Sequence, residues 1–559
     1  MAPTPSIVHL PNGQNLTVTP VFGGYFFKPS GLNIHTHVFP TGWTVIIQSE
    51  DFSDGNHEED PENVELPGIP KEKKRHIHPF RQPTLGNDNL FISSISNPSS
   101  HDFKSPTSPT RQIAMMLWAS LYWYFHLQEP SPYLQNEASM KTPLSGRPKG
   151  EWRINIKREG VLRGRNLIQK LERMGLITTE DSTVGLIPEE NTAEGWSEMF
   201  ISRRTFWQLS AKLFLFNLTP TSGSTPMGSP YNSRPSSPVP GGDRNSSSGN
   251  KDIGDSSVLW SPSNSGPFSS GSGLPTYFPP PPLQYTMTSG IRHPLRPKPA
   301  RQGEIFYTRY IPSVGQYLSF RTASISRKPV AYSGPTTSLN VPKHHAGASI
   351  SSLPNHIKTS SVIDSASTTL PESTDTTLMT DIQLLNRWMN VDRVSRFWGC
   401  AGSPETQESF LRSSLTSKNS FPAIGLWDGK PFGYFEIYWV KEDTLGKYLG
   451  DRAGDYDRGV HVLVGEEEFR GKHRVNAWIS SLAHWAFLQD YRTNAVVLEP
   501  RVDNERYTSF AESEVKLTWY RFISHLNDAG FLKEGEISFP HKQSALVKLR
   551  RENFEAPSL

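Results

Sequence analysis

Residues 461–488 read HVLVGEEEFRGKHRVNAWISSLAHWAFL, a pattern that predicts a strand, a basic turn and a helix in that order. Residues 461–465 suit a strand, and residues 475–488 carry apolar side chains at helical spacing, which predicts an amphipathic helix. The free N–H groups and positive dipole end of such a helix attract anions, and Gly471 would let the backbone approach one closely. Lys472 and Arg474 would add charge toward phosphate groups. The hexapeptide 469–474 alone is equally compatible with a basic surface turn, but the strand before it and the helix after it favour an anion site.

The elements around this turn alternate between helix and strand. Asp428-Gly429 between two apolar runs is a strong signal for a tight hairpin. The uninterrupted apolar run near residue 497 predicts a buried central strand. The expected order is helices at 384–389 and 405–415, strands at 421–427, 432–440 and 461–465, the helix at 475–488, a strand at 495–499, a helix at 522–529, and strands at 535–539 and 544–549.

Composition predicts folded domains separated by unfolded segments. The chain has 559 residues, with 35% hydrophobic residues and 47 prolines, but also 14 Trp, 29 Phe and 18 Tyr. The low hydrophobic content and the high proline content are typical of disordered segments. The high aromatic content is typical of folded domains. The 57 Lys and Arg nearly balance 54 Asp and Glu, and the net charge of +3 argues against binding driven by nucleic-acid phosphates.

Changes in composition along the chain indicate the expected domain boundaries. Residues 1–218 mix strand-like segments at 18–27 and 43–48 with helical segments at 112–127 and 159–175, which predicts an α/β lobe. We expect a disordered Ser/Pro/Gly-rich insert at 219–275, an ordered segment that packs on the lobes at 276–324, a Ser/Thr-rich linker at 325–376, and the C-terminal α/β domain at 377–559.

Cysteine usage and the absence of apolar spans point to an intracellular protein. Cys400 is the single cysteine, which excludes an internal disulfide and a cysteine-based zinc cluster, and we expect no metal site. No apolar run approaches the roughly 18 residues of a transmembrane helix, and the N-terminus lacks the layout of a secretory signal. Pro557-Ser558-Leu559 differs from the Ser-Lys-Leu peroxisomal address at two positions, which favours the cytoplasm over the peroxisome.

The element order and several motifs resemble known acyltransferases. The order is similar to that of the acetyl-CoA-dependent N-acyltransferases of the GNAT fold, whose strand, basic turn and helix hold the coenzyme A pyrophosphate. From about residue 381 onward the chain resembles the siderophore acyltransferases, which include bacterial aerobactin and mycobactin enzymes, and above all the fungal enzymes that acylate N(5)-hydroxyornithine. The motifs are LNRWMN at 385–390, RFWG at 396–399, GYFEIYW at 433–439, DRGVH at 457–461 and EPRVDN at 499–504.

The resemblance implies an α/β protein with a C-terminal GNAT fold. Two-lobed members of this fold family pair such a domain with a degenerate GNAT-like lobe, and the mixture of strands and helices before Asn217 permits such a lobe here without requiring it. The resemblance also implies transfer of an acyl group from coenzyme A, a co-substrate rather than a tightly bound cofactor, to the hydroxylamino nitrogen of N(5)-hydroxy-L-ornithine. The product is a hydroxamate, an iron ligand. In the family a His in a Gly-x-His strand is the general base, and His461 occupies this position. Such a base increases the reaction rate roughly 10²–10⁴-fold. Val462 is the candidate oxyanion donor. Coenzyme A is expected to contact Val462, Val464, Arg470, Gly471, Lys472 and Arg474.

The residues expected to bind the substrate match the family pattern less closely than those expected to bind coenzyme A. Bacterial relatives carry a catalytic Asp where this chain has Arg501, so Asp503 becomes the candidate acid, although Asp503 and Asn504 would equally well cap the next helix. Arg501 or Lys542 would hold the ornithine carboxylate, and Glu499 and Asn504 complete the expected substrate-binding set. Trp398, Tyr438 and Trp439 are candidates for the acyl-pocket wall, with burial in the core as the alternative.

Residues 507–521 interrupt the family pattern. Removal of these fifteen residues joins Arg506 to Phe522 and restores a helix cap and a helix start. Fifteen codons keep the reading frame, and Arg-Tyr, Lys-Leu-Thr and Tyr-Arg can be encoded with the GT, branch-point and AG signals of an intron. We hypothesise that this segment is a retained intron that impairs activity.

Three functions are compatible with these residues. The leading one is hydroxyornithine acylation, with anhydromevalonyl favoured over acetyl because of the general likeness of the N-terminal part and the linker to the anhydromevalonyl enzymes. The others are acyl transfer to a lysine or polyamine, and a non-catalytic scaffold that binds coenzyme A. His461 favours an enzyme, whereas the 507–521 segment favours the scaffold. A homo-oligomer and contacts with other siderophore-pathway enzymes are further hypotheses.

Overall fold

The computed structural model describes residues 5–30, 40–53, 74–96, 109–134, 137–179, 199–215, 283–337, 375–502 and 522–559. The predicted insert at 219–275, most of the predicted linker, Asp503, Asn504 and the segment 507–521 lie outside these residues. The chain divides into two compact units, one of residues 1–300, 438–460 and 475–559 and the other of residues 301–437 and 461–474.

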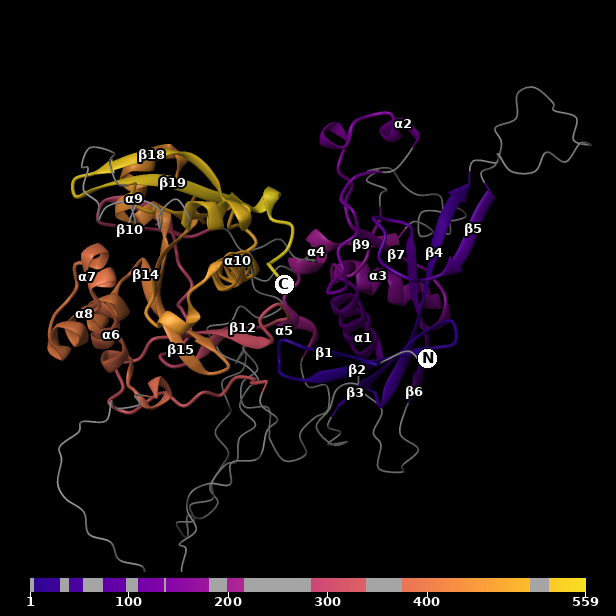
Figure 1. Cartoon of the computed structure of the whole chain (residues 1–559), viewed down its shortest axis with the longest axis horizontal. Coiled ribbons are helices and arrows are strands. Elements are labelled where there is room, and N and C mark those ends of the chain that lie inside the picture. Colours follow the sequence, from indigo (N-terminus) through magenta and orange to yellow (C-terminus); the bar gives the residue numbers. More distant parts are fainter. Residues whose placement is uncertain are drawn as a thin grey trace, which may run out of the picture. The chain divides into compact units, whose positions relative to one another are not determined.

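The N-terminal lobe is built on a nine-stranded mixed sheet (Figure 1). Its strand order is β1-β2-β3-β4-β6-β7-β9-β8, with β5 paired to β4. Neighbouring strands are antiparallel except β6 and β7, which are parallel. The strands are β1 (Ser6–His9), β2 (Asn15–Val21), β3 (Gly24–Pro29), β4 (Gly42–Ser53), β5 (Lys74–Pro79), β6 (Asp88–Ser96), β7 (Arg153–Ile156), β8 (Thr178–Thr179) and β9 (Met199–Ser202).

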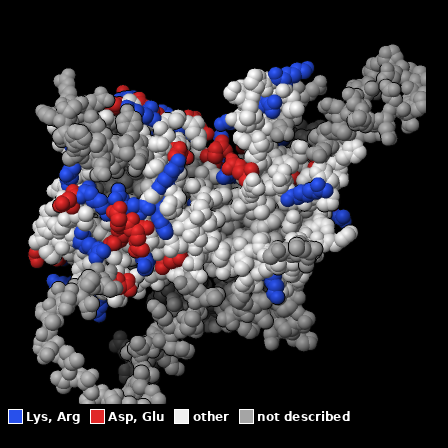
Figure 2. Space-filling model, viewed as in Figure 1, with Lys and Arg blue, Asp and Glu red and all other residues white. Residues whose placement is uncertain are grey.

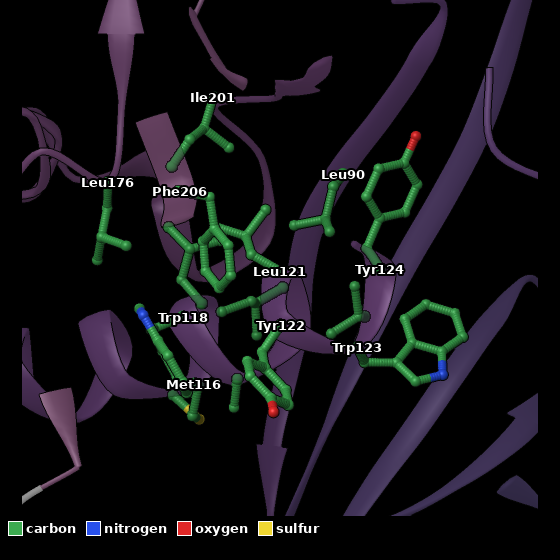
Figure 3. Packing of buried hydrophobic residues seen from close by; sticks show 14 of the residues in the cluster. Leu90, Met116, Trp118, Leu121, Tyr122, Trp123, Tyr124, Leu176, Ile201 and Phe206 are labelled. Carbon is green, nitrogen blue, oxygen red and sulfur yellow. The ribbon is translucent and has the colours of Figure 1, made fainter. Parts of the chain in front are cut away.

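Helix α1 (Pro109–Tyr124) is the centre of the lobe's core. Its residues 112–124 are all buried, as predicted for a helix that is apolar almost all round, and Figure 3 shows Trp118 and Tyr122 of this helix beside Phe206. Trp43 donates a hydrogen bond from Nε1 to Ser120 Oγ over 3.0 Å, which joins β4 to the helix. The other helices of the lobe are α2 (Glu137–Met140), α3 (Arg165–Arg173), α4 (Arg203–Trp207) and α5 (Ala211–Phe214).

The predicted single strand at 18–27 is wrong. The chain turns at residues 22–23, where Gly23 has a φ of +79°, and β2 and β3 form a hairpin with Val18 opposite Phe27. A left-handed residue inside a strand pattern breaks the strand, and glycine adopts that conformation without steric cost.

The C-terminal sheet has eight strands in the order β12-β13-β14-β15-β16-β17-β19-β18. The pairing of β16 with β17 is parallel, and β17–β19 and β18–β19 are antiparallel. The strands are β12 (Ile305–Ile311), β13 (Gln316–Thr322), β14 (Ser420–Trp427), β15 (Lys430–Trp439), β16 (Arg458–Val464), β17 (Ala495–Leu498), β18 (Leu532–Phe539) and β19 (Lys542–Arg550); β10 (Tyr285–Thr288) and β11 (Ile291–Pro294) form a separate hairpin.

Helices connect these strands largely as predicted. They are α6 (Asp381–Met389), α7 (Asp392–Trp398), α8 (Pro404–Thr416), α9 (Thr444–Leu449) and α10 (Lys472–Gln489), and residues 522–528 are helical. Sequence reasoning missed α7 and α9. It also predicted an amphipathic α10, whereas residues 477–487 are all buried. The polar His484 is accommodated because its Nε2 lies 2.6 Å from the carbonyl oxygen of Trp207.

The two sheets share one topology. In each, four antiparallel strands lead to a central strand, a helix crosses to a parallel neighbour, and an antiparallel pair closes the edge. Strands β6 and β7 with helix α1 correspond in this way to β16 and β17 with helix α10. The expected degenerate copy of the GNAT lobe is therefore present as a repeated strand order.

The ordered C-terminal part begins earlier than composition suggests. Strands β12 and β13 belong to the C-terminal sheet, although the expected boundary lies at residue 377. Residues 325–337 of the predicted linker are also described; Tyr332 lies 2.9 Å from Ser319 through its hydroxyl, and Thr337 donates to Asp428. Side-chain anchors order this segment despite its Ser- and Thr-rich composition. Residues 557–559 lie against the structure, and the Ser558 N–H donates to Ser480 Oγ.

In the described part of the chain, none of the helices is both long and apolar enough to cross a membrane. Figure 2 shows acidic and basic side chains interspersed on the face in view, in keeping with a net charge of +3.

A buried ion pair joins β13 to α6 across the segment 338–374. Arg321 donates two hydrogen bonds to Asp381, over 2.5 and 2.7 Å, and the Ser324 N–H donates to the same carboxylate over 2.7 Å. Both side chains are almost fully buried. Removal of one partner would leave the other charge buried and uncompensated.

We therefore predict that Asp381→Ala lowers the free energy of unfolding of this part of the protein by about 3–5 kcal/mol. Asp392→Ala, which removes an exposed carboxylate from the first turn of α7, is the matched control and should cost less than about 1 kcal/mol. Thermal unfolding of the full chain compares them, and equal midpoints for the two variants would contradict the prediction.

Candidate active site

The register of β15 against β16 places the proposed base. The Val440 N–H donates to the Asp457 carbonyl and the Gly465 N–H to the Phe432 carbonyl, at opposite ends of the pairing. These two bonds put Glu436 directly opposite His461. Directly opposed residues of an antiparallel pair present their side chains on the same face of the sheet. The register therefore brings a carboxylate to the imidazole.

His461 and Glu436 are hydrogen-bonded. Nδ1 of His461 lies 3.1 Å from Oε2 of Glu436, and the two side chains are 32% and 24% exposed. The second carboxylate oxygen, Oε1, accepts a hydrogen bond of 3.0 Å from the hydroxyl of Ser420 on β14. The pair is thus held at a site that remains partly open to solvent.

Three neighbours define the surroundings of this pair. The ring of Trp398, at the end of α7, meets the His461 ring edge-on at 6.5 Å and the Tyr434 ring at 5.7 Å. Burial raises the pKa of the Tyr434 hydroxyl, and the charge of Glu436 raises it further. The pKa of the Cys400 thiol is raised for the same two reasons. Both groups are therefore neutral near pH 7, and the structure places Trp398, a predicted substrate residue, beside His461.

The end of β16 is anchored to α7. Strand β16 pairs with β17 at Arg458 and Gly459, and Val462 and Val464 further along β16 are half-buried. Arg393 donates to the carbonyl oxygens of Val464 and Gly465 over 2.8 and 2.5 Å. These bonds fix the backbone from which Val462 and Val464 were predicted to contact the acyl donor.

The predicted basic turn connects β16 to α10. Gly471 has a φ of +131°, and a Cβ atom there would lie 3.1 Å from the His473 ring. Lys472 opens the eighteen-residue helix α10 and is exposed. The backbone at this helix start is therefore suited to an anion.

Arg470 and Arg474, both predicted phosphate ligands, contact other side chains of the protein. Arg470 donates to both carboxylate oxygens of Glu467, over 2.8 and 3.0 Å. Arg474 donates to Gln316 Oε1 over 3.0 Å and lies over the Trp427 ring at 4.8 Å. Burial lowers the pKa of Arg474. The guanidinium group of Arg474 is thus engaged within the protein and is a weaker candidate for the donor phosphates than the sequence indicated.

The other predicted substrate residues that the structure describes, at positions 438, 439, 499, 501 and 542, belong to the unit that contains residues 438–460 and 475–559. Tyr438 donates from its hydroxyl to Glu499 over 2.8 Å, and Lys542 Nζ lies 3.6 Å from the other oxygen of Glu499. Arg501 pairs with Ser544 through its backbone. Trp439 is stacked between the guanidinium groups of Arg458 and Arg296, at 3.2 and 4.2 Å, which is a core environment rather than a pocket wall.

Comparison of the sequence with known proteins shows the family to which this chain belongs. The acetyltransferase (GNAT) domain family matches residues 377–539. The N5-hydroxyornithine acetylase sidL of Beauveria bassiana is 46% identical over 97% of this chain and 100% of its own length. This chain belongs to the siderophore acyltransferases of the GNAT superfamily. It is therefore an acyl-CoA-dependent N-acyltransferase with acyl-CoA as co-substrate.

Two further relatives match part of the chain. The N(5)-hydroxyornithine:cis-anhydromevalonyl coenzyme A-N(5)-transacylase SIDF of Beauveria bassiana is 41% identical over 33% of this chain and 36% of its own length. The N(6)-hydroxylysine O-acetyltransferase of Escherichia coli is 39% identical over 32% of this chain and 50% of its own.

Sequence reasoning missed Glu436 and Ser420 as members of the site. A signal for Glu436 was present, because it is the one charged residue in the otherwise apolar strand segment FGYFEIYWV at 432–440. Ser420 carried no comparable signal. A serine at the start of a strand is ordinary, and only the pairing of β14 with its neighbours brings it to the carboxylate.

A glycine substitution tests the anion site at the turn. Gly471→Ala introduces a side chain at a φ of +131° and should raise the dissociation constant for coenzyme A about tenfold, because the strained turn must shift away from the helix start. Gly450→Ala is the control, since Gly450 also has a positive φ (+56°) but nothing within 4 Å of the added atom. Calorimetric titration with coenzyme A measures both variants, and equal affinities would refute the assignment of this turn.

Proposed function

We propose that this protein transfers an acetyl group from acetyl-CoA to the hydroxylamino nitrogen of N(5)-hydroxy-L-ornithine. The single observation that carries the proposal is the His461–Glu436 pair, which is partly open to solvent; His461 lies on β16, the strand that leads through a basic turn into α10, and Glu436 lies opposite it on β15. The turn and the start of α10 suit the phosphates of the donor, and His461 lies on the strand just before them.

The chemistry needs one proton acceptor. The hydroxylamino nitrogen attacks the thioester carbonyl, a C–N bond forms and, after the tetrahedral intermediate, the C–S bond breaks. The proton leaves the nitrogen for the His461 imidazole and is returned to the thiolate of coenzyme A. The products are a hydroxamate and free coenzyme A. Val462 would supply its backbone N–H to the developing oxyanion.

The charged side chains of Glu499, Arg501 and Lys542 suit an amino-acid substrate. Arg501 and Lys542 are candidates for the α-carboxylate, and Glu499 is a candidate for the α-amine. Glu499 is already held by Tyr438 and Lys542, so its carboxylate is fixed before substrate arrives. Asp503 and Asn504 remain candidates for the acid and for substrate binding on the sequence argument alone.

Acetyl is the first acyl group to test. The relative that matches the chain over almost its whole length is named an acetylase, whereas the anhydromevalonyl transacylase matches one third of the chain. This comparison supports acetyl over the anhydromevalonyl group that general likeness of the N-terminal part favoured.

The reaction is tested by coenzyme A release from acetyl-CoA with N(5)-hydroxy-L-ornithine, and by detection of the hydroxamate as its ferric complex. His461→Gln should lower kcat roughly 10²–10⁴-fold because the general base is lost. His9→Gln, on β1 of the N-terminal lobe, is the matched control and should retain activity. Binding of acetyl-CoA without turnover by the wild-type protein would favour the scaffold instead, and turnover with lysine or a polyamine alone would favour the other acceptor class.

Acyl selectivity is tested at Trp398. Its ring stands beside His461, so Trp398→Ala should open space near the reacting carbonyl and raise the kcat/KM ratio of anhydromevalonyl-CoA to acetyl-CoA about tenfold. Trp439→Phe, in the stack between two guanidinium groups, is the control and should leave this ratio unchanged. A ratio that responds at Trp439 and not at Trp398 would contradict the assignment.

A further inference from the structure

We infer that Glu436 is the positioning carboxylate of His461, which holds the imidazole in the tautomer that can accept a proton and stabilises the imidazolium once it has formed. This inference rests on the proposed function for its kinetic consequences. The hydrogen bond that carries it is a feature of the structure itself.

The partner determines the tautomer. An ionised carboxylate can only accept hydrogen bonds, so the contact of 3.1 Å between Glu436 Oε2 and His461 Nδ1 requires the proton to lie on Nδ1. The lone pair of the neutral ring is then on Nε2, at the opposite side of the ring from Glu436. The nitrogen that accepts the substrate proton is therefore Nε2.

The carboxylate is itself held in place. Ser420 Oγ donates to Oε1 over 3.0 Å, and the Ser420 N–H and hydroxyl in turn contact Ser417 Oγ. Cys400 and Tyr434 also face the carboxylate, and burial keeps both neutral near pH 7. Among these neighbours, Glu436 supplies the negative charge beside the imidazole. An opposite charge at hydrogen-bond distance favours the protonated imidazole that forms during the reaction.

The N-terminal lobe supplies an internal comparison. The parallel pairs Leu90–Ile156 and Gly459–Val497 align β6 with β16, so Ile92 corresponds to His461. Val45 lies opposite Ile92, as Glu436 lies opposite His461. Val45 and Ile92 are both fully buried. The same fold is therefore built with an aliphatic pair at this position, so the fold does not require a hydrogen-bonded polar pair, and the retention of one in the C-terminal lobe points to chemistry.

The closing experiment has a readout that does not need turnover. In the full-length protein labelled with ¹⁵N-histidine, the His461 resonances, assigned by their loss in His461→Gln, should show protonated Nδ1 and unprotonated Nε2 at neutral pH. In Glu436→Gln this preference should weaken, because a neutral amide can accept or donate. Protonated Nε2 in the wild-type protein would overturn the inference even if the enzyme is active, and the protonated Nδ1 would uphold it even if hydroxyornithine proves not to be the substrate.

Kinetics then separate a positioning role from a merely structural one. With the acceptor established in the assay above, Glu436→Gln should lower kcat about 10–100-fold with little change in the KM for acetyl-CoA. The acidic limb of kcat/KM against pH should move to lower pH, since loss of the carboxylate disfavours the charged imidazole. Glu436→Asp keeps the negative charge, so the acidic limb of kcat/KM should stay at the pH of the wild type, and kcat should fall less than in Glu436→Gln. Glu408→Gln, at a surface ion pair with Arg412 on α8, is the control and should match the wild type. The inference would be overturned if kcat fell equally in Glu436→Gln and Glu436→Asp and the acidic limb of kcat/KM stayed at the same pH in both.

Discussion

The antiparallel pairing of β15 with β16 is the constraint on which the proposed site depends. Its register is closed at both ends by main-chain hydrogen bonds, and Gly433 permits it, because a Cβ there would lie 2.3 Å from the Leu463 carbonyl oxygen. A shift of one residue would turn His461 and Glu436 to opposite faces of the sheet. The close packing of the strands therefore sets the chemistry of the imidazole as well as the stability of the sheet.

The repeated topology explains why the chain is longer than one acyltransferase domain. The N-terminal lobe has the strand order of the C-terminal one but has Val45 and Ile92 at the position of the proposed Glu436–His461 pair. Helix α10 is buried almost all round, and His484 on it contacts the Trp207 carbonyl of α4. The helix that begins at the proposed anion site is thus surrounded by protein along most of its length.

Much of the C-terminal fold could be predicted from the sequence because its signals are local. Asp428-Gly429 forms the expected tight turn, with φ values of +46° and +86°, the combination that a two-residue hairpin requires. Helices α6 and α8 begin within a few residues of the expected positions. The failures share a cause. Strands β12 and β13 are separated from β14 by about one hundred residues of chain, and neither composition nor periodicity reports pairing at that distance.

The sequence by itself determined the order of helices and strands after residue 380, the basic turn with Gly471, and the resemblance that led to the acyltransferase family. Each of these is written in contiguous residues. Only the tertiary structure decided that Glu436 is the partner of His461, that Arg474 is engaged with Gln316 and Trp427, and that Trp439 lies in the core. The physical reason is that strand register and side-chain packing arise from contacts between residues far apart in the chain, which no local pattern encodes.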